Sequence, residues 1–372
     1  MSPHIISLPV SRRAIIQDAQ GQPQLVKDLP IPPLVSGTVL IKPAAVALNP
    51  SDYKMGAAFP SAGAIIGYDF AGTIIAVADN DDTENTCDFA PGDWVCGGVR
   101  GSNPTAHEEG GFASYIRASS SLLLRIPRSS PVAKLSIEQA STLATGLATC
   151  TLAIWDPTGL NLLPATPETP AEVPLPVLVY GGSTATGNLA IQLLKLSGFD
   201  PIATCSPRNY DLVRGAGASA VFDYSHPDVA ATIKEHTAGR LKHVIDCISD
   251  ARSVALCYEA IARAGGRYVS LELVADELLA QRRAVHASFL LGFEITGKSS
   301  GLPGGYGKPA DPAKVQLGLK LWPIYQRLLN AGKLKPHPVQ RLEGGLEGIV
   351  EGLALLKSGS VSGKKLVAVL EE

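Results

Sequence analysis

A glycine-rich turn between a strand and a helix is the part of this sequence best suited to chemistry. The apolar segment VLVYG ends at Gly181, and Gly182 and Gly187 follow before a helical stretch rich in leucine. Backbone amides at such a turn, with the positive end of the helix, can bind a pyrophosphate. The strict G-x-G-x-x-G spacing is not met, so the strand and helix context supports the prediction more than the motif does. The predicted contacts with a dinucleotide are Gly181, Gly182, Ser183, Thr184, Ala185 and Thr186.

The residues after the next strand bear on the choice between NAD and NADP. An acid there would bind the ribose 2′-hydroxyl and repel a 2′-phosphate. The segment TCSPRN, 204–209, has no acid, and its hydroxyl and guanidinium groups suit a phosphate. The sequence therefore favours NADPH as the cofactor, with contacts at Ser206, Pro207, Arg208 and Asn209. Tyr224, at the end of the third strand, is a further candidate to cover the adenine or reach the phosphate.

The elements around this turn predict a doubly wound α/β fold. Apolar strands VLVYG, PIATC, SAVFDY, HVIDCI and RYVSL alternate with helical stretches such as ATGNLAIQLLKLSG and ARSVALCYEAIARAGG. Short apolar strands alternating with amphipathic helices indicate a parallel sheet covered on both faces. We expect this dinucleotide-binding domain to span residues 161–310.

The chain before this domain has a different rhythm. From Thr38 to Pro127, short strands separated by glycine and proline predict an all-β body. Ser136 begins a capping-box pattern and one helix in which Ile137, Ala140, Leu143, Ala144 and Leu147 share a face. Residues 156–176 hold six prolines and predict an exposed, semi-rigid connection. We assign residues 1–160 to a first, β-rich domain.

The end of the chain is expected to return to the first domain. Helices are predicted over 311–331 and 344–357, and a strand over KKLVAVL. A tail of this size has no core of its own, so we expect residues 311–372 to complete the β-rich domain.

Composition limits the classes of protein that this chain could be. Its 372 residues are 45% hydrophobic and 18% charged, which suits a two-domain globular protein. The 32 basic and 34 acidic residues form no long block of one sign, which argues against nucleic acid as a partner. Neither a secretory signal nor an apolar run of transmembrane length is evident, so we expect no membrane contact and a cytoplasmic protein. The cysteines stand singly and suggest small buried side chains: Cys87, Cys96, Cys150, Cys205, Cys247 and Cys257.

Taken in order, LNPSDYK, GYDFAG, PGDWV, GGFASY and YGGSTATG resemble the medium-chain dehydrogenase/reductase superfamily over nearly the whole chain. The resemblance implies a GroES-like catalytic domain and a Rossmann-type domain. More narrowly, YGGSTATGNLAIQLLKLSGFDPIATCSPRNYDL, FDYSHPD, RAGGRYVSL and SGKKLV are similar to the trans-acting enoyl reductases that serve fungal highly reducing polyketide synthases.

The superfamily divides into zinc alcohol dehydrogenases and zinc-free reductases, and the residues favour the second group. Zinc alcohol dehydrogenases often carry Gly-His-Glu where this chain has Gly67-Tyr68-Asp69, and the region of the structural zinc lobe contains only Cys96. We therefore expect no metal. The reaction expected of such a reductase is hydride transfer to the β-carbon of an enoyl thioester, with polar groups stabilising the thioester oxygen and a proton reaching the α-carbon.

Site residues beyond the two motifs above come from the resemblance. It implies that Ser51, Asp52, Tyr53 and Lys54 lie beside the nicotinamide, with Lys54 as the leading proton donor or oxyanion partner and Tyr53 as a weaker one. The resemblance also places four further residues near the nicotinamide, which are Leu271, Glu272, Val361 and Ser362. No physical reason for an acid at Glu272 is evident.

Two segments correspond to substrate-facing walls, although packing explains their small residues equally well. These are the helical segment Leu143, Ala144, Thr145, Gly146, Leu147, Ala148, Thr149 and Cys150 and the strand segment Ile295, Thr296, Gly297, Lys298 and Ser299.

Two other functions stay open at this point. A zinc-free quinone oxidoreductase or small enone reductase would share the cofactor site, and a non-catalytic protein could bind NADPH without turnover. If the narrower resemblance holds, the substrate arrives on a carrier domain of a polyketide synthase, which is then a transient partner. By the same resemblance we expect a monomer.

Overall fold

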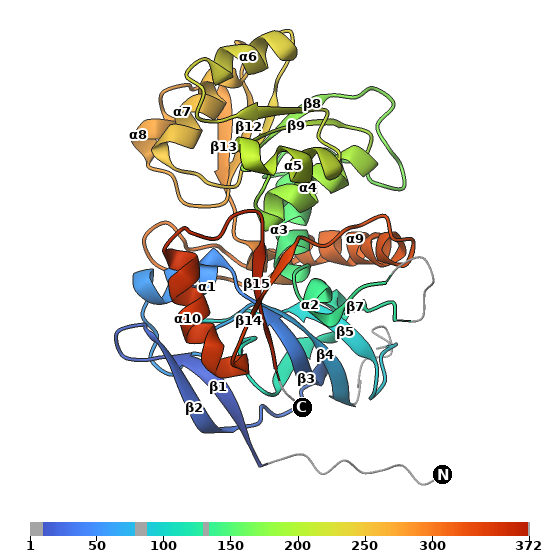
Figure 1. Cartoon of the computed structure of the whole chain (residues 1–372), viewed down its shortest axis with the longest axis vertical. Coiled ribbons are helices and arrows are strands. Elements are labelled where there is room, and N and C mark those ends of the chain that lie inside the picture. Colours follow the sequence, from blue (N-terminus) through green and yellow to red (C-terminus); the bar gives the residue numbers. More distant parts are fainter. Residues whose placement is uncertain (1–9, 79–87, 129–133, 371–372) are drawn as a thin grey trace.

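The structure, a computed structural model, describes residues 10–78, 88–128 and 134–370 and consists of two sheet-based halves joined by helices (Figure 1). The β-rich half lies in the lower part of Figure 1 and the parallel sheet in the upper part, with the green helix α3 (Ala144–Trp155) between them. Among the described residues, no helix is long and apolar enough to cross a membrane. Cys87 lies outside the described residues, and the other five cysteines are free thiols.

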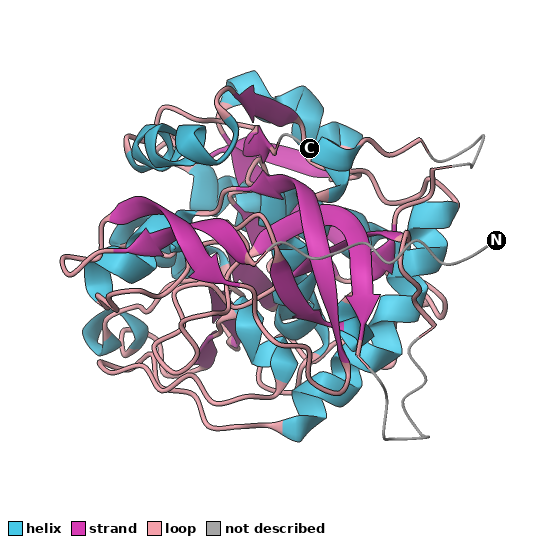
Figure 2. Cartoon of the chain, turned by 90° about the horizontal axis from the view of Figure 1, so that it is seen from below, coloured by secondary structure: helices cyan, strands magenta, loops and turns pink. Residues whose placement is uncertain are grey.

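The β-rich half is built on a seven-stranded sheet of order β14-β15-β3-β4-β5-β7, with β6 paired to β3. A separate hairpin, β1-β2, packs beside it, and Figure 2 shows these strands from below. The strands are β1 (Ser11–Gln17), β2 (Pro23–Pro30), β3 (Thr38–Ala47), β4 (Asp69–Val77), β5 (Trp94–Gly98), β6 (Ile116–Ser119), β7 (Leu124–Arg125), β14 (Val339–Leu342) and β15 (Lys365–Val369). A short 3-10 helix, η1 (Ser120–Leu122), precedes β7.

The last residues of the chain belong to this same sheet. Helices α9 (Pro312–Asn330) and α10 (Gly345–Lys357) precede the two terminal strands. Strand β15 pairs antiparallel with β3, and β14 pairs parallel with β15. Lys365 is thereby placed near Asp69, although 296 residues separate them in sequence.

Two short helices replace the one that the sequence predicts after Ser136. Ser136 does cap α2 (Ile137–Ala140), since its side chain accepts a hydrogen bond from the Gln139 amide. The helix then stops and α3 begins at Ala144. Ser141 and Thr142 interrupt it, because their hydroxyls donate to the carbonyls of Glu138 and Gln139 and compete with the helical pattern.

The second half has the parallel, doubly wound sheet that the sequence predicts, in the order β10-β9-β8-β11-β12-β13. Its strands are β8 (Pro176–Tyr180), β9 (Asp200–Cys205), β10 (Ala220–Asp223), β11 (His243–Asp246), β12 (Gly266–Ser270) and β13 (Val285–Phe289). The helices are α4 (Ala185–Leu196), α5 (Tyr210–Gly215), α6 (Val229–His236), α7 (Ala251–Ala260) and α8 (Asp276–Leu279), with a 3-10 turn η2 (Pro207–Asn209) before α5.

The connection between the halves is more buried than its six prolines suggest. Leu160 and Leu162 belong to the main hydrophobic core, and the indole nitrogen of Trp155 donates to the Ala165 carbonyl at 2.7 Å. The prediction of an exposed connection is therefore wrong for its first part, because two leucines fix it to the core. Its later residues Val173 and Leu175 are exposed.

Candidate active site

A pocket of about 770 Å³ lies at the carboxyl ends of β8, β9, β11 and β12, where ligands of open α/β sheets bind. Helix α1 (Pro50–Ala58) closes it from the β-rich half. The glycine-rich turn after β8, called the phosphate turn below, contributes Gly181 and residues 183–186 to the lining, whereas Gly182 does not line the pocket. Residues after β9 and the segment from Leu290 to Phe293 complete the lining. The pocket therefore draws on both halves of the chain.

The phosphate turn is built for close backbone approach. Gly181 has φ +80°, a left-handed conformation that favours glycine. A Cβ on Gly187 would lie 2.4 Å from the Gly181 carbonyl oxygen, so only glycine lets α4 start so near the strand. Thr184 caps α4 by accepting a hydrogen bond from the Gly187 amide at 3.0 Å. The other backbone amides at this helix end suit a pyrophosphate, and their contact with it stays a prediction.

A second group of polar residues lies beyond the turn, at the ends of β9 and β10. The hydroxyls of Ser206 and Tyr224 are 2.9 Å apart, and Arg208 lines the same end of the pocket. Arg252 of α7 joins them, because it donates to the Tyr224 carbonyl and lies over the Tyr224 ring. Sequence reasoning missed Arg252, since nothing local links α7 to this corner.

The charges in this corner are suited to an anion. Among the residues that the structure describes, the Arg208 guanidinium has no hydrogen-bonded or ionic partner.

Two residues that are also predicted as cofactor contacts, Pro207 and Asn209, do not line the pocket. Asn209 instead donates to Ser362 at 3.0 Å and so ties the second half to the C-terminal segment.

Lys54 and Glu272 face each other at the opposite end of the pocket. The Lys54 ammonium lies 2.8 Å from a carboxylate oxygen of Glu272, which follows β12. The hydroxyl of Tyr306 donates to the other carboxylate oxygen of Glu272. The acid that the sequence left unexplained is therefore the partner of Lys54.

The other residues predicted near the nicotinamide divide between the pocket and the core. Ser51, Tyr53, Leu271, Val361 and Ser362 line the pocket. Asp52 does not, since it is 1% exposed and accepts a hydrogen bond from the Asn49 amide at 2.6 Å at the start of α1. Burial raises the pKa of Asp52 well above its ordinary value, which the Asn49 hydrogen bond opposes. Asp52 completes the capping box of α1, whose N-cap is Asn49, and its predicted contact with the cofactor has no geometric support.

Asp69 is fully buried, and both oxygens of its carboxylate have hydrogen-bonding partners from other segments of the chain. The Lys365 ammonium lies 2.6 Å from one carboxylate oxygen, which also accepts from the Asn49 amide side chain. The Thr145 amide and hydroxyl donate to the other oxygen, at 2.7 and 2.8 Å. Within residues 10–78, 88–128 and 134–370, no group of three or more His, Cys, Asp or Glu side chains is arranged to hold a metal ion.

Most of the residues predicted as substrate-facing walls do not line this pocket. Of residues Leu143–Cys150, only Thr145 and Thr149 line the pocket, and Gly146 packs against Leu189. The predicted strand over residues 295–299 is absent, because Gly292–Thr296 forms a 3-10 helix, η3, and Gly297 has a left-handed φ of +69°. None of residues 295–299 lines the pocket. The wall consists instead of Leu290, Leu291, Gly292, Phe293 and Tyr306, which face Met55, Phe59 and Tyr68.

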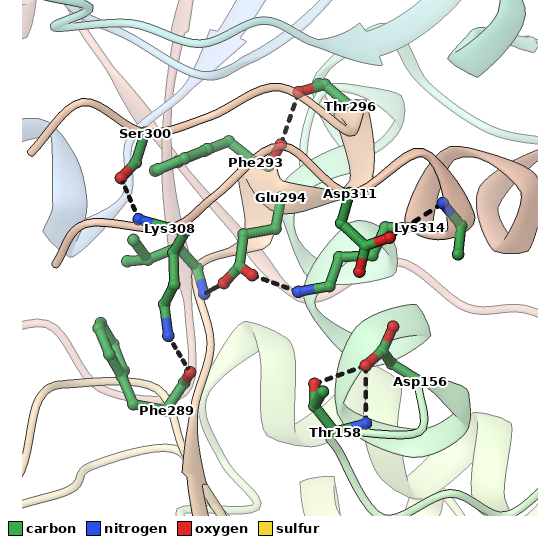
Figure 3. Close-up of polar contacts among 12 residues, drawn as sticks. Asp156, Thr158, Phe289, Phe293, Glu294, Thr296, Ser300, Lys308, Asp311 and Lys314 are labelled. Carbon is green, nitrogen blue, oxygen red and sulfur yellow. Dashed lines mark hydrogen bonds and ion pairs between the residues drawn. The ribbon is translucent and has the colours of Figure 1, made fainter.

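Polar contacts hold this wall in place (Figure 3). Glu294 pairs with Lys314 of α9, both nearly buried, and accepts from the Leu291 amide at 2.7 Å. Lys308 donates through its ammonium to the Phe289 carbonyl at 2.6 Å, and through its amide to the Ser300 hydroxyl at 2.7 Å. The segment is fixed at both ends, so its aromatic side chains are presented in a defined arrangement.

Comparison with known proteins agrees with this architecture. The alcohol dehydrogenase GroES-like domain model matches residues 35–128, and the zinc-binding dehydrogenase model matches residues 185–300. The structure of CurK enoyl reductase has a TM-score of 0.72 at 19% identity, covering 97% of this chain and 100% of that one. The quinone oxidoreductase of Coxiella burnetii has a TM-score of 0.68 at 23% identity, covering 97% and 99%. At such identities these likenesses show the fold alone.

Sequence relatives are far more similar. Trans-enoyl reductase TwmE of Talaromyces wortmannii is 50% identical over 372 residues, covering 98% of this chain and 99% of its own. Trans-enoyl reductase RAP2 of Pyricularia oryzae is 43% identical over 365 residues, covering 98% and 99%. The chain is an oxidoreductase with a nicotinamide cofactor, and it belongs to the trans-enoyl reductases of the medium-chain dehydrogenase/reductase superfamily.

Proposed function

We propose that this enzyme uses NADPH to reduce the carbon–carbon double bond of an enoyl thioester carried by a polyketide synthase. The observation that supports the proposal most is the two-ended pocket. One end offers a phosphate turn and the Arg208 guanidinium, and the other offers the Lys54 ammonium beside an aromatic wall.

The residues present fit NADPH. The turn from Gly181 to Thr186 would hold the pyrophosphate, and Ser206, Arg208 and Arg252 would hold the 2′-phosphate. The absence of an acid after β9 removes the group that would repel this phosphate. When bound, the reduced nicotinamide supplies a hydride for the β-carbon of the substrate.

Lys54 would complete the reduction. Its ammonium can stabilise the negative charge that develops on the thioester oxygen and then give a proton to the α-carbon, so that an N–H bond is broken and a C–H bond is formed. The Lys54 side chain is 48% exposed, so the resulting amine can regain a proton from water. The Tyr53 hydroxyl, in the same lining, is the second candidate donor.

The aromatic wall would receive the acyl chain. Met55, Phe59, Leu291, Phe293 and Tyr306 offer an apolar surface next to Lys54. A chain lying there would place its thioester near the ammonium while its carrier arm remains outside. Transient docking of a synthase carrier domain is the interaction that this arrangement requires.

The decisive experiment presents the purified enzyme with NADPH and either a crotonyl thioester or a small quinone. NADPH oxidation with a saturated thioester detected by mass supports the proposal. Quinone turnover without thioester turnover would instead make it a quinone oxidoreductase. Binding of NADPH, seen by fluorescence, without oxidation by any acceptor would indicate a non-catalytic protein.

The oligomeric state and the location are part of the same proposal. We expect a monomer in solution, so a light-scattering mass near twice 38.8 kDa would contradict it. The cytoplasmic location stays a prediction from the sequence.

A further inference from the structure

Glu272 connects three parts of the chain at the reacting end of the pocket. It follows β12 in the second half, and its two carboxylate oxygens take separate donors. Lys54, on α1 of the first half, donates to one at 2.8 Å, and Tyr306, between η3 and α9, donates to the other. All three side chains line the pocket.

We propose that Glu272 is a positioning residue that holds the Lys54 ammonium toward the substrate, and that Tyr306 fixes Glu272 in turn. The inference rests on the proposed function, in which Lys54 acts on the thioester. A half-exposed lysine has a flexible four-carbon stem and samples many rotamers unless a partner restricts it. Glu272 can restrict the Lys54 side chain in this way, because Tyr306 holds the other oxygen of its carboxylate.

Tyr306 is itself held rigidly, which the proposal requires. Its ring packs edge-on against Phe59, with centroids 5.1 Å apart, and against Phe289, with centroids 5.3 Å apart. Its carbonyl accepts from the Ser300 hydroxyl at 2.9 Å. Because Phe59 directly follows the helix that carries Lys54, the ring also fixes the distance between that helix and Glu272.

The charge states agree with these roles. Burial alone would raise the pKa of Glu272, but the hydrogen bonds from Lys54 and Tyr306, the Lys54 charge and the Leu273 amide lower it below its ordinary value. Burial and the bond to Glu272 raise the pKa of Tyr306 to about 12. At neutral pH, Glu272 is thus an ionised acceptor and Tyr306 a neutral donor.

The test compares Glu272→Gln, Tyr306→Phe, Lys54→Met and the double variant Lys54→Met/Glu272→Gln, assayed with NADPH and the crotonyl thioester. Exposed Glu277→Gln and distant Tyr115→Phe are the matched controls. We expect Glu272→Gln to lower kcat by about 10- to 100-fold with the KM for NADPH unchanged, which is the size of loss that a misplaced catalytic group causes. The double variant should be no slower than Lys54→Met, because Glu272 acts only through Lys54.

The pH profile separates positioning from a purely structural role. Protonation of Glu272 should make kcat fall at low pH, and this fall is the acid limb of the pH profile. In Tyr306→Phe, Glu272 loses one of the hydrogen bonds that lower its pKa, so the acid limb should move to higher pH. In Glu272→Gln that limb should disappear. Far-UV circular dichroism at each pH ensures that only folded enzyme is compared.

Each other outcome counts against a specific claim. If the losses of kcat in the double variant are additive, the positioning role is overturned and the proposed function stands. The same holds if Tyr306→Phe leaves the acid limb of the pH profile in place. If the wild type reduces quinones but no thioester, the proposed function fails, and the same variants assayed with the quinone then decide the positioning role. A wild type without turnover on either acceptor overturns both.

Discussion

Arg208 and Arg252 reach the same corner of the pocket from different elements, and this makes the cofactor preference testable at the level of single side chains. Arg252 is held by the Tyr224 carbonyl and ring, whereas Arg208 has no such partner among the described residues. Arg252 and Arg208 can bind a phosphate together. Arg208 should contribute most to the affinity for a cofactor that carries the 2′-phosphate and least to the affinity for one that lacks it.

Arg208→Ala should therefore weaken NADPH by about 10- to 100-fold, the range of one hydrogen bond between charged groups, and leave NADH nearly unchanged. Calorimetric titration with both cofactors measures the two affinities. Arg214→Ala, an exposed arginine of α5 outside the pocket, is the control. Equal losses for NADPH and NADH would show that Arg208 does not bind the 2′-phosphate.

The buried pair of Lys365 and Asp69 joins the terminal strand to the middle of the first sheet. Lys365 is 5% exposed and Asp69 is fully buried, so either charge left alone would lack water. Lys365→Met should lower the free energy of unfolding by about 3 to 5 kcal/mol, the usual cost of an unpaired buried charge.

Urea denaturation measures this loss, with exposed Lys320→Met as the control. Asp69→Asn should be destabilising for the same reason, and the double variant should lose less than the sum of the two single losses. Simple additivity would mean that the two charges do not stabilise each other.

At the scale of elements, the sequence predicts whatever is locally determined. Strands β8 to β12 are apolar runs between turns, and the phosphate turn follows one of them directly, so both were predictable. Strand β13 was missed because Val285–Phe289 lies at the sheet edge and exposes His286 and Ala287. Helix α1 was not predicted either, since its nine residues include Pro50 and Gly56 and show no apolar face.

The rest of the site depends on contacts between residues distant in sequence. Lys54 and Glu272 are 218 positions apart, and Tyr306 is 34 beyond Glu272. The pairing of Asp69 with Lys365 depends on how β15 joins the sheet. A pattern within one segment contains no information on such pairs. The predicted strand over residues 295–299 is wrong for a related reason, because Gly297 ends a 3-10 helix packed on α9.

The junction of the phosphate turn with α4 gives a prediction at this scale. Gly187→Ala would place a Cβ against the Gly181 carbonyl, so α4 would have to move away from the turn. We expect a loss of about 1 to 3 kcal/mol in stability, typical of overpacking, together with weaker binding of both NADPH and NADH.

Thermal unfolding and cofactor titration measure the two effects. Gly215→Ala is the matched control, because a Cβ at Gly215, in α5, would meet nothing within 4 Å. It should be neutral or slightly stabilising, since alanine favours a helix over glycine. Normal cofactor binding in Gly187→Ala would show that the close approach is not needed.

At the scale of the whole molecule, one hydrophobic cluster spans the two halves, in addition to the clusters that lie within each half. Ala71 and Cys96 of the first sheet belong to the same cluster as Val177 and Val179 of the second, with the residues of α3 between them. The Lys54 to Glu272 and Asn209 to Ser362 contacts add polar links across the pocket. We therefore expect the halves to unfold together rather than one after the other.

Acid should destabilise both halves, because each contains a histidine that is held neutral. His337, next to β14, is 2% exposed, and neither ring nitrogen has a partner among the described residues. Burial, together with the Lys365 charge, lowers the pKa of His337 to about 4. Burial and the charges of Arg267 and Lys242 lower the pKa of His243, in β11, to about 4 as well.

Each histidine takes up a proton in the unfolded chain near pH 6.5 but in the folded chain only near pH 4. The unfolded state therefore binds more protons between these values, and the free energy of unfolding should fall as pH falls from 6.5 to 4. His337 alone should contribute on the order of 3 kcal/mol to this fall. Urea denaturation across this pH range measures it, and His337→Leu should flatten the dependence while exposed His286→Gln leaves it intact. An unchanged slope in His337→Leu would mean that the imidazole is charged, or hydrated, in the folded protein.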